Sequence, residues 1–390
     1  MIFSAFARTV GISACTSCLL TTAAVAQDDV LNIGFAVSLT GYLAPYDTPT
    51  VEGAKIAIDE LNAAGGADGK FKIESMIRDV RSDTVQTSIV VQELVDAGAD
   101  IIVLPCDDDP AIAGGLIAQD AGIPSFSTCA TNASLTQAIG EFYFVNYVAD
   151  IVQGATLAQY AREQDLSTAY LLVSPETTYT GNLPEYFGEV FTTLGGAVVG
   201  KGTYSFGQQD FSAEVTRIAN LDPHPDVVMT SAYEPDFPAF LRQLRSAGVM
   251  SAVYGSDGID SPTTVSLGDV SEGVVFSNAG FPVEGSPLAA FFAKYNDVYG
   301  QPLTNSFAAT GYDMILVIQE AARVAGSLEG AALQQAVSEI DGLNVSTGTI
   351  TYAGRNGIPA RSVSLNQVSN GAVVHLDTRV IDAALLPASK

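Results

Sequence analysis

The sequence has few of the residues that several common functions require. It holds 17 Lys and Arg against 43 Asp and Glu, a formal net charge of −26. So acidic a chain repels nucleic acid and anionic lipid surfaces, and we expect neither as a partner. The two histidines, His224 and His375, lie in a loop-like and a strand-like stretch. A Ser-His-Asp arrangement therefore lacks a plausible base.

Other catalytic and metal-binding motifs are missing as well. There is no G-x-S-x-G elbow, and "GGADGKF" at 65–71 has neither the spacing nor the Ser/Thr of a phosphate-binding loop. The aspartates at 107–109 lack the alternating spacing and central glycine of a calcium loop. We therefore predict no catalytic residue, no metal and no cofactor.

Long apolar runs are confined to the N-terminus. Arg8 precedes "TVGISACTSCLLTTAAVA", which closes on Ala24-Val25-Ala26, so residues 1–26 are predicted to be a secretory signal peptide. The alternative is a lipid-anchored N-terminus at Cys15, in "ISAC". No later segment offers the roughly 18 uninterrupted apolar residues of a membrane span. We expect the mature protein in the periplasm.

Cysteine is scarce after residue 26, where only Cys106 and Cys129 remain. Each follows a predicted strand, and the two strands are consecutive. An exported pair at such positions favours a disulfide, with two buried free thiols as the alternative.

Apolar residues, by contrast, make up 47% of the chain, enough for a large core. Short apolar runs such as "VLNIGFAVSL" and "DIIVLP" alternate with segments of helical periodicity such as "TVEGAKIAIDELNAAGG". The alternation restarts near residue 149, and the length exceeds what one core usually covers. These features predict an α/β fold with two doubly wound parallel sheets.

Polar clusters follow the predicted strands. They are "SLTGYLAPYD", "PCDDD", "STCAT", "SPETTYTG", "SAYEPD" and "YGSDG". In open parallel sheets, ligands bind beyond the carboxyl ends of the strands. We therefore expect the functional site to be built from these clusters.

Several of these segments, in this order and spacing, resemble the periplasmic solute-binding proteins of ABC importers, of the branched-chain amino-acid/amide-binding type. The segments include "IGFAVSLTGYLAPYDTPTVEGAKIAIDELNAAGG", "ELVDAGADIIVLPC", "GIPSFSTCATNASLT" and "TNSFAATGYDMI". The resemblance covers nearly the whole mature chain. It implies two lobes joined by three crossovers, near 145–149, 277–281 and 347–356, that close on a ligand by hinge motion.

The resemblance also implies how the chain divides and what it binds. One lobe would comprise residues 28–146 and 280–350, and the other residues 147–279 and 351–385. The expected partners are a small amino-acid-like, amide or amine ligand and the membrane subunits of an ABC permease, with the receptor itself monomeric. Two alternatives remain: a sensory ligand-binding protein for a chemoreceptor or kinase, and a hydrolase that uses Asp107 and Asp257.

Eight positions match the family's ligand-binding positions. They are Tyr46, Asp107, Cys129 (through its carbonyl), Thr131, Tyr179, Tyr233, Asp257 and Phe307. In the family, Asp257 matches an acid that pairs with the ligand's ammonium. Position 107 is commonly a hydroxyl that, with the residue at 131, holds the ligand's carboxylate.

The acid at position 107 departs from that pattern. An ionised Asp donates no hydrogen bond and cannot receive a carboxylate as a hydroxyl can. The sequence therefore favours a ligand that presents an amine, amide or hydroxyl there. Alternatively the aspartates only cap a helix, and the Asp-Pro pair makes Asp109 the preferred cap.

Overall fold

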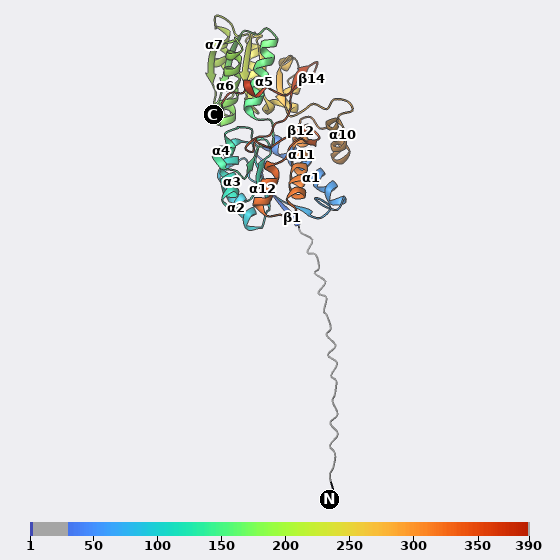
Figure 1. Ribbon diagram of the computed structural model, residues 1–390. Helices are drawn as coiled ribbons and strands as arrows, with labels where there is room; N and C mark the ends of the chain where they lie inside the picture. Colours follow the sequence, from blue (N-terminus) through green and yellow to red (C-terminus); the bar gives the residue numbers. More distant parts are fainter. Residues whose placement is uncertain (3–29, 389–390) are drawn as a thin grey trace.

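The computed structural model describes residues 1–2 and 30–388. Within these residues the chain forms two α/β lobes, each built on its own sheet and stacked end to end (Figure 1). The predicted signal peptide and Cys15 fall in the stretch that lies outside the described residues. The fold predicted from the sequence is confirmed.

Five parallel strands form the sheet of the first lobe, in the order β2-β1-β3-β4-β5. They are β1 (Val30–Val37), β2 (Lys72–Asp79), β3 (Ile101–Leu104), β4 (Ser125–Ser127) and β5 (Tyr143–Phe144). The helices between them are α1 (Ala44–Ala63), α2 (Thr84–Asp96), α3 (Asp108–Asp120) and α4 (Leu135–Ile139). Every residue of β3 is buried, because helices cover both faces of a parallel sheet.

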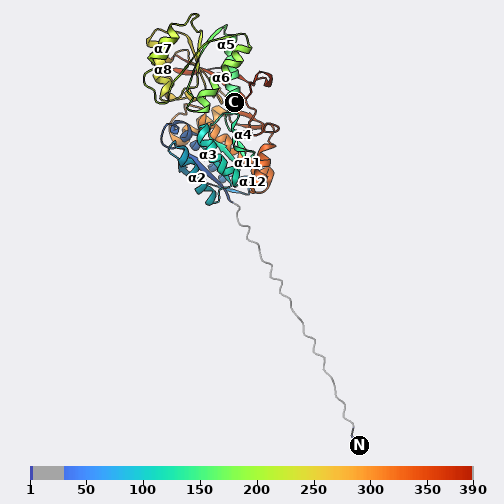
Figure 2. The same ribbon diagram turned by 90° about the vertical axis from the view of Figure 1, so that its left-hand side faces the viewer.

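Seven strands form the sheet of the second lobe, in the order β14-β13-β10-β9-β8-β6-β7. They are β6 (Thr168–Val173), β7 (Ala197–Thr203), β8 (Val227–Thr230), β9 (Ala252–Gly255), β10 (Val275–Asn278), β13 (Val363–Ser369) and β14 (Ala372–Arg379). The helices are α5 (Asp150–Glu163), α6 (Thr178–Thr193), α7 (Ser212–Ala219), α8 (Asp236–Ser246) and α9 (Pro262–Ser266), with short 3-10 turns at Asp257–Ile259, Gly268–Ser271 and Ala383–Leu385. Helices α5 and α6 cover one face of this sheet, and α7 and α8 the other (Figure 2).

The last two strands of this sheet are antiparallel, which the expectation of parallel sheets did not include. Strand β13 pairs antiparallel with β10 and with β14. The link between β13 and β14 is a tight turn in which Asn370 and Gly371 both have positive φ, at 52° and 72°. Asn-Gly is a strong signal for such a hairpin turn, so the antiparallel edge was readable from the sequence.

Helices far along the chain return to the first lobe: α10 (Pro287–Tyr299), α11 (Phe307–Ala325) and α12 (Gly330–Ser338). Helix α11 crosses α1 so closely that a Cβ on Gly53 would lie 1.7 Å from the Ala308 carbonyl oxygen. A Cβ on Gly311 would lie 2.0 Å from the Thr50 carbonyl oxygen. Glycine is therefore required on both helices, and the crossing brings the start of α11 beside the start of α1.

The chain passes between the lobes at 145–149, at 279–286 and at 351–362. The third passage lies later than the predicted 347–356. The reason is that the hairpin of β11 (Leu343–Val345) and β12 (Gly348–Ile350) packs into the core of the first lobe through Val345, Ile350 and Tyr352. The residue limits of the lobes stay a prediction.

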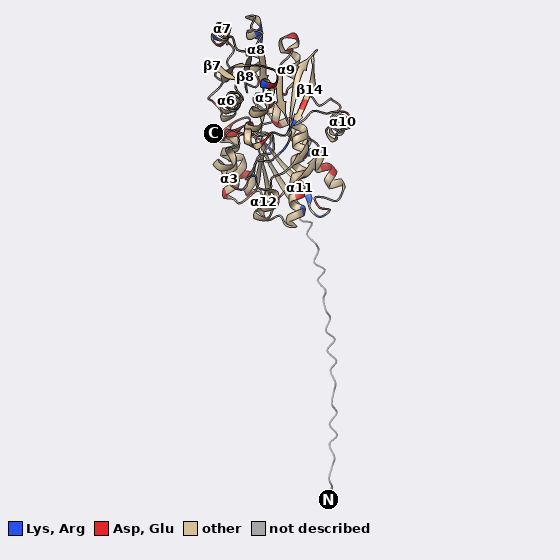
Figure 3. Ribbon diagram, turned by 45° about the horizontal axis from the view of Figure 1, so that its top comes forward, with Lys and Arg blue, Asp and Glu red and all other residues tan. Residues whose placement is uncertain are grey.

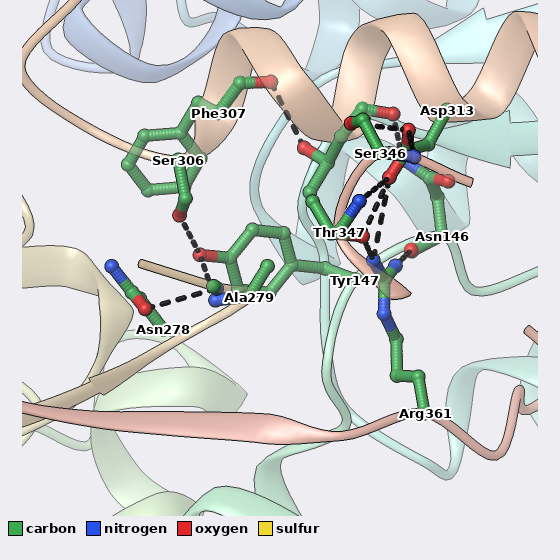
Figure 4. A network of polar contacts seen from close by, with 12 residues as sticks. Asn146, Tyr147, Asn278, Ala279, Ser306, Phe307, Asp313, Ser346, Thr347 and Arg361 are labelled. Carbon is green, nitrogen blue, oxygen red and sulfur yellow. Dashed lines mark hydrogen bonds and ion pairs between the residues drawn. The ribbon is translucent and has the colours of Figure 1, made fainter. Parts of the chain in front are cut away.

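A buried polar network joins the hinge segments (Figure 4). Asp313 on α11 accepts hydrogen bonds from the Ser346 N–H at 2.7 Å, the Ser346 hydroxyl at 2.6 Å and the Thr347 N–H at 3.1 Å. Arg361 lies 3.9 Å from the same carboxylate and donates to the Asn146 carbonyl and the Thr347 hydroxyl. One ion pair thus connects the first and third hinge segments to α11.

Acidic residues are spread over both lobes and basic ones are sparse (Figure 3). Over the described part of the chain, none of the helices combines the length and apolar character needed to cross a membrane.

Candidate functional site

The disulfide predicted from the sequence is confirmed and lies at the mouth of the first sheet. Cys106 and Cys129 are bonded, with their Cα atoms 4.5 Å apart, and they tie the residues after β3 to those after β4. Both cysteines line the central cavity described below. The covalent link therefore fixes the floor of the site.

Asp47, which the sequence analysis did not single out, supports this floor from below. It is fully buried and accepts hydrogen bonds from the Ser38 N–H at 2.6 Å, the Cys106 N–H at 2.9 Å and the Thr128 hydroxyl at 2.5 Å. Burial raises the pKa of Asp47 to about 7, although these three donors oppose the rise. One carboxylate thus organises the ends of β1, β3 and β4.

Asp107 both caps a helix and faces the cleft. Its extended backbone (φ −165°, ψ 153°) makes it the N-cap of α3, and its Oδ1 accepts from the Asp108 N–H at 2.8 Å. The preference for Asp109 as the cap was wrong. The helix begins two residues earlier, and Pro110 therefore lies within its first turn. The N–H groups of the first turn have no acceptor within the helix, so the missing N–H of proline costs no hydrogen bond there.

The other oxygen of Asp107 meets two tyrosines. Its Oδ2 lies 3.4 Å from the Tyr42 hydroxyl and 3.3 Å from the Tyr233 hydroxyl, which belongs to the second lobe. Burial and the neighbouring charges of Asp108 and Asp109 raise the pKa of Asp107 to about 8.

Tyr179 and Asp257 form the facing wall, on the second lobe. The Tyr179 hydroxyl donates to Asp257 Oδ1 at 2.9 Å, contacts the Ser256 hydroxyl at 2.7 Å and accepts from the Gly258 N–H at 2.9 Å. This arrangement orients the Asp257 carboxyl group. Burial raises its pKa to about 7, against the lowering effect of hydrogen bonds from Gln153 and Tyr179.

Aromatic rings close the space between the walls. Tyr46 meets Phe307 edge-on at 5.3 Å and Tyr233 edge-on at 6.1 Å between ring centroids. Tyr179 packs against Tyr233 at 5.9 Å. The Tyr46 hydroxyl also donates to the Gly258 carbonyl of the opposite lobe at 3.0 Å. Because the lobes touch directly here, the structure shows the cleft closed.

These walls surround a small central cavity between the two lobes. Its lining comprises Leu43, Tyr46, Cys106, Asp107, Asp108, Cys129, Ala130, Thr131, Tyr179, Tyr233, Asp257, Gly258 and Phe307. All eight sequence-predicted binding residues are among them, and neither histidine is. The structure brings the predicted residues together; that they hold a ligand stays a prediction.

Two further acids, Asp108 and Asp150, adjoin the cavity and were missed as site residues. Asp108 lines it, accepts from the Thr178 hydroxyl of the second lobe through Oδ2, and leaves Oδ1 without a partner. Asp150, at the start of α5, is fully buried and has the Thr131 hydroxyl as its hydrogen-bond partner. Burial raises the pKa of Asp108 to about 6 and that of Asp150 well above its usual value. The run of three aspartates was a signal for Asp108; nothing local marked Asp150.

Comparison with known proteins shows which family this chain belongs to. The family described as "Periplasmic binding protein" matches residues 30–372. The chain belongs to this family. This match and the relatives below confirm the predicted resemblance to the branched-chain amino-acid/amide-binding type. They also confirm that the family is periplasmic and is associated with amino-acid transport.

Individual likenesses are distant but cover most of each chain. The Leu/Ile/Val-binding protein BraC3 of Rhizobium johnstonii is 25% identical over 346 residues, which cover 88% of this periplasmic binding protein and 93% of the relative. The crystal structure of a leucine binding protein LivK from Thermotoga maritima, 25% identical, superposes with a TM-score of 0.82 over 90% of this chain and 98% of that one. LivJ from Streptococcus pneumoniae, solved in complex with isoleucine, is 24% identical and gives a TM-score of 0.80 over 90% and 99%.

Proposed function

We propose that this protein is the extracytoplasmic receptor of an ABC importer. In this role it captures a small amino-acid-like, amide or amine ligand between its lobes and presents the closed complex to the membrane permease. The family and the relatives, all solute-binding proteins, support a receptor in place of an enzyme. We further propose that it is exported by cleavage after residue 26 and acts as a monomer.

The observation that carries the proposal is a cavity lined by both lobes. Asp107 and Thr131 come from one lobe, and Tyr179 and Asp257 from the other. A ligand in such a position holds the lobes together, so that binding and closure become one equilibrium.

The proposal is tested in two steps. A thermal-shift screen against amino acids, amides, amines and small carboxylates should find a ligand, because binding to the folded state alone raises the melting temperature. Small-angle scattering with and without that ligand should then show a smaller radius of gyration when it is bound, and a mass equal to one chain.

The same samples distinguish the alternatives. Stoichiometric binding without any product supports a receptor, whereas turnover of the ligand supports a hydrolase that uses Asp107 and Asp257. An unchanged radius with a tight ligand would contradict capture between the lobes.

A further inference from the structure

The cavity contains several acids and no balancing cation. Asp107 and Asp108 enter from the first lobe and Asp257 from the second, while Asp150 lies near enough that the charges of the other three raise its pKa. We call these four residues the pocket acids. None of the residues that line the cavity is Lys, Arg or His. The buried Arg361 is committed to Asp313 and the hinge.

Fully buried polar side chains line this space. Asp108 and Thr131 are both 0% exposed there, and Asp108 Oδ1 has no partner at hydrogen-bond distance among the described residues. Buried polar atoms are almost always satisfied, so this oxygen is available to accept a hydrogen bond from a bound water or ligand. An ionised carboxylate can only accept, so the group that satisfies it must be a donor.

A carboxylate on the ligand would meet more like charges than charged donors here. The position that carries a hydroxyl in similar proteins is Asp107, whose oxygens are engaged by the Asp108 N–H and two tyrosines. A ligand carboxylate near Asp107 and Asp108 would place like charges in a dry space, which costs several kcal/mol. A ligand cation in that space would instead supply the missing partner.

The aromatic lining suits a cation as well. Tyr46, Tyr179, Tyr233 and Phe307 surround the cavity. Aromatic faces attract ammonium groups electrostatically, and rings gathered with carboxylates are a recurring way to hold organic cations. The same rings bury the carbon skeleton of the ligand.

From these contacts we propose that the ligand is a small organic amine: a compound with a protonated N–H nitrogen, a short apolar body and no carboxylate. This inference rests on the proposed receptor function and narrows its ligand class. The ammonium lies between Asp107 and Asp257 and donates to Asp108 Oδ1, which has no partner among the described residues.

The test compares amino acids with the amines left when their carboxylate is removed. Leucine is paired with 3-methylbutylamine and with 4-methylpentanoate, which keeps the carboxylate and lacks the ammonium; valine and isoleucine are treated likewise. Calorimetry on the wild-type protein should show at least one amine binding roughly tenfold or more tighter than its amino acid, and no binding of the acids. The inference is overturned if an amino acid binds as tightly as its amine, or if no amine binds.

Variants at position 107 sharpen the result. Asp107→Ser and Asp107→Asn both keep an N-cap that can accept from the Asp108 N–H, so α3 should still form. Asp107→Ser should lower the amine-to-amino-acid preference by roughly tenfold or more, because a hydroxyl can receive a carboxylate. Asp107→Asn should weaken the amine. An unaltered ranking in Asp107→Ser would show that Asp107 only caps the helix.

Failure of this inference is distinguishable from failure of the proposed function. If the protein closes on a carboxylate-bearing ligand, the receptor function stands and the amine assignment falls. If no compound of any class compacts the protein in scattering, the receptor function itself falls.

Discussion

The hinge and the pocket bury carboxylates equally well but surround them differently. Asp313 at the hinge and Asp150 beside the pocket are both 0% exposed. Asp313 accepts four hydrogen bonds from Ser346 and Thr347 and faces Arg361. Asp150 has the Thr131 hydroxyl and three other carboxylates around it.

The difference separates buried acids that are held by donors from buried acids that face one another. Asp47 and Asp260 resemble Asp313: each receives three hydrogen bonds from surrounding donors. Hydrogen bonds to a carboxylate favour its charged form. Around Asp108 and Asp150, by contrast, neighbouring carboxylates add to the effect of burial and raise the pKa of both groups.

The largest expected effect is at the hinge. Asp313→Asn leaves Arg361 buried without its counter-ion and should lower the free energy of unfolding by about 3–5 kcal/mol in urea denaturation. Glu320→Gln, on the same helix, breaks an exposed ion pair with Arg323 and serves as the control, with little expected change. Equal losses of unfolding free energy in the two variants would show that the buried ion pair contributes no more than the exposed one.

The second largest effect is expected from removing the disulfide at the floor of the pocket. Replacing both Cys106 and Cys129 with Ser opens a loop with a sequence separation of 23. Loop-closure entropy predicts a loss of about 3 kcal/mol, measured by the same denaturation. Counting thiols in denatured, unreduced wild-type protein should find neither cysteine free; two reactive thiols would refute the bond.

A third prediction concerns binding. Asp257→Asn should weaken an amine ligand by about 2 kcal/mol or more in calorimetry, because a desolvated charge pair is lost. Asp236→Asn is the matched control: Asp236 is a buried acid of the same lobe, with its pKa raised to about 6, and it does not line the cavity. Comparable weakening in both variants would mean that Asp257 acts only through the overall charge.

The smallest effect is on pH dependence. In the closed, empty state burial raises the pKa of Asp107 to about 8 and of Asp257 to about 7, from 3.8. The closed state therefore binds more protons than a state with these groups exposed, and its stability falls as pH rises from about 4 to 8. The groups acting on Asp107 are Tyr42, Asp108, Asp109 and Tyr233, and those acting on Asp257 are Gln153, Tyr179 and Asp260.

Scattering without ligand should accordingly show the radius of gyration growing between pH 5 and pH 8.5. An amine should suppress the change and bind more tightly as pH rises, because it favours the ionised acids. The double variant Asp107→Asn, Asp257→Asn should lose most of the dependence. A radius of gyration that shrinks with rising pH would contradict the raised pKa values of Asp107 and Asp257.

Much of the site could be predicted from the sequence because local signals were sufficient. Asp107 and Thr131 each follow a strand, and parallel strands end at the same edge of a sheet. The disulfide followed from the same placement. The hairpin of β13 and β14 was missed although Asn370-Gly371 signalled it locally.

Other residues carried no local signal at all. Asp47 supports the floor through Cys106 and Thr128, which lie 59 and 81 positions away along the chain. Asp150 opens a helix and looks like an ordinary first-turn acid that favours the helix dipole. Only folding reveals that Asp47 is held by three donors and that Asp150 faces three other acids.

The sequence by itself determined the alternation of strands and helices, the polar clusters at the strand ends and the excess of acid, since periodicity, turn chemistry and charge are properties of neighbouring residues. The tertiary structure decided which acids are partnered. The donors around Asp313 and Asp47, and the acids that gather around Asp150, depend on how segments far apart in the chain come together. Burial and neighbouring charges, which follow from that packing, set the pKa of each carboxyl group.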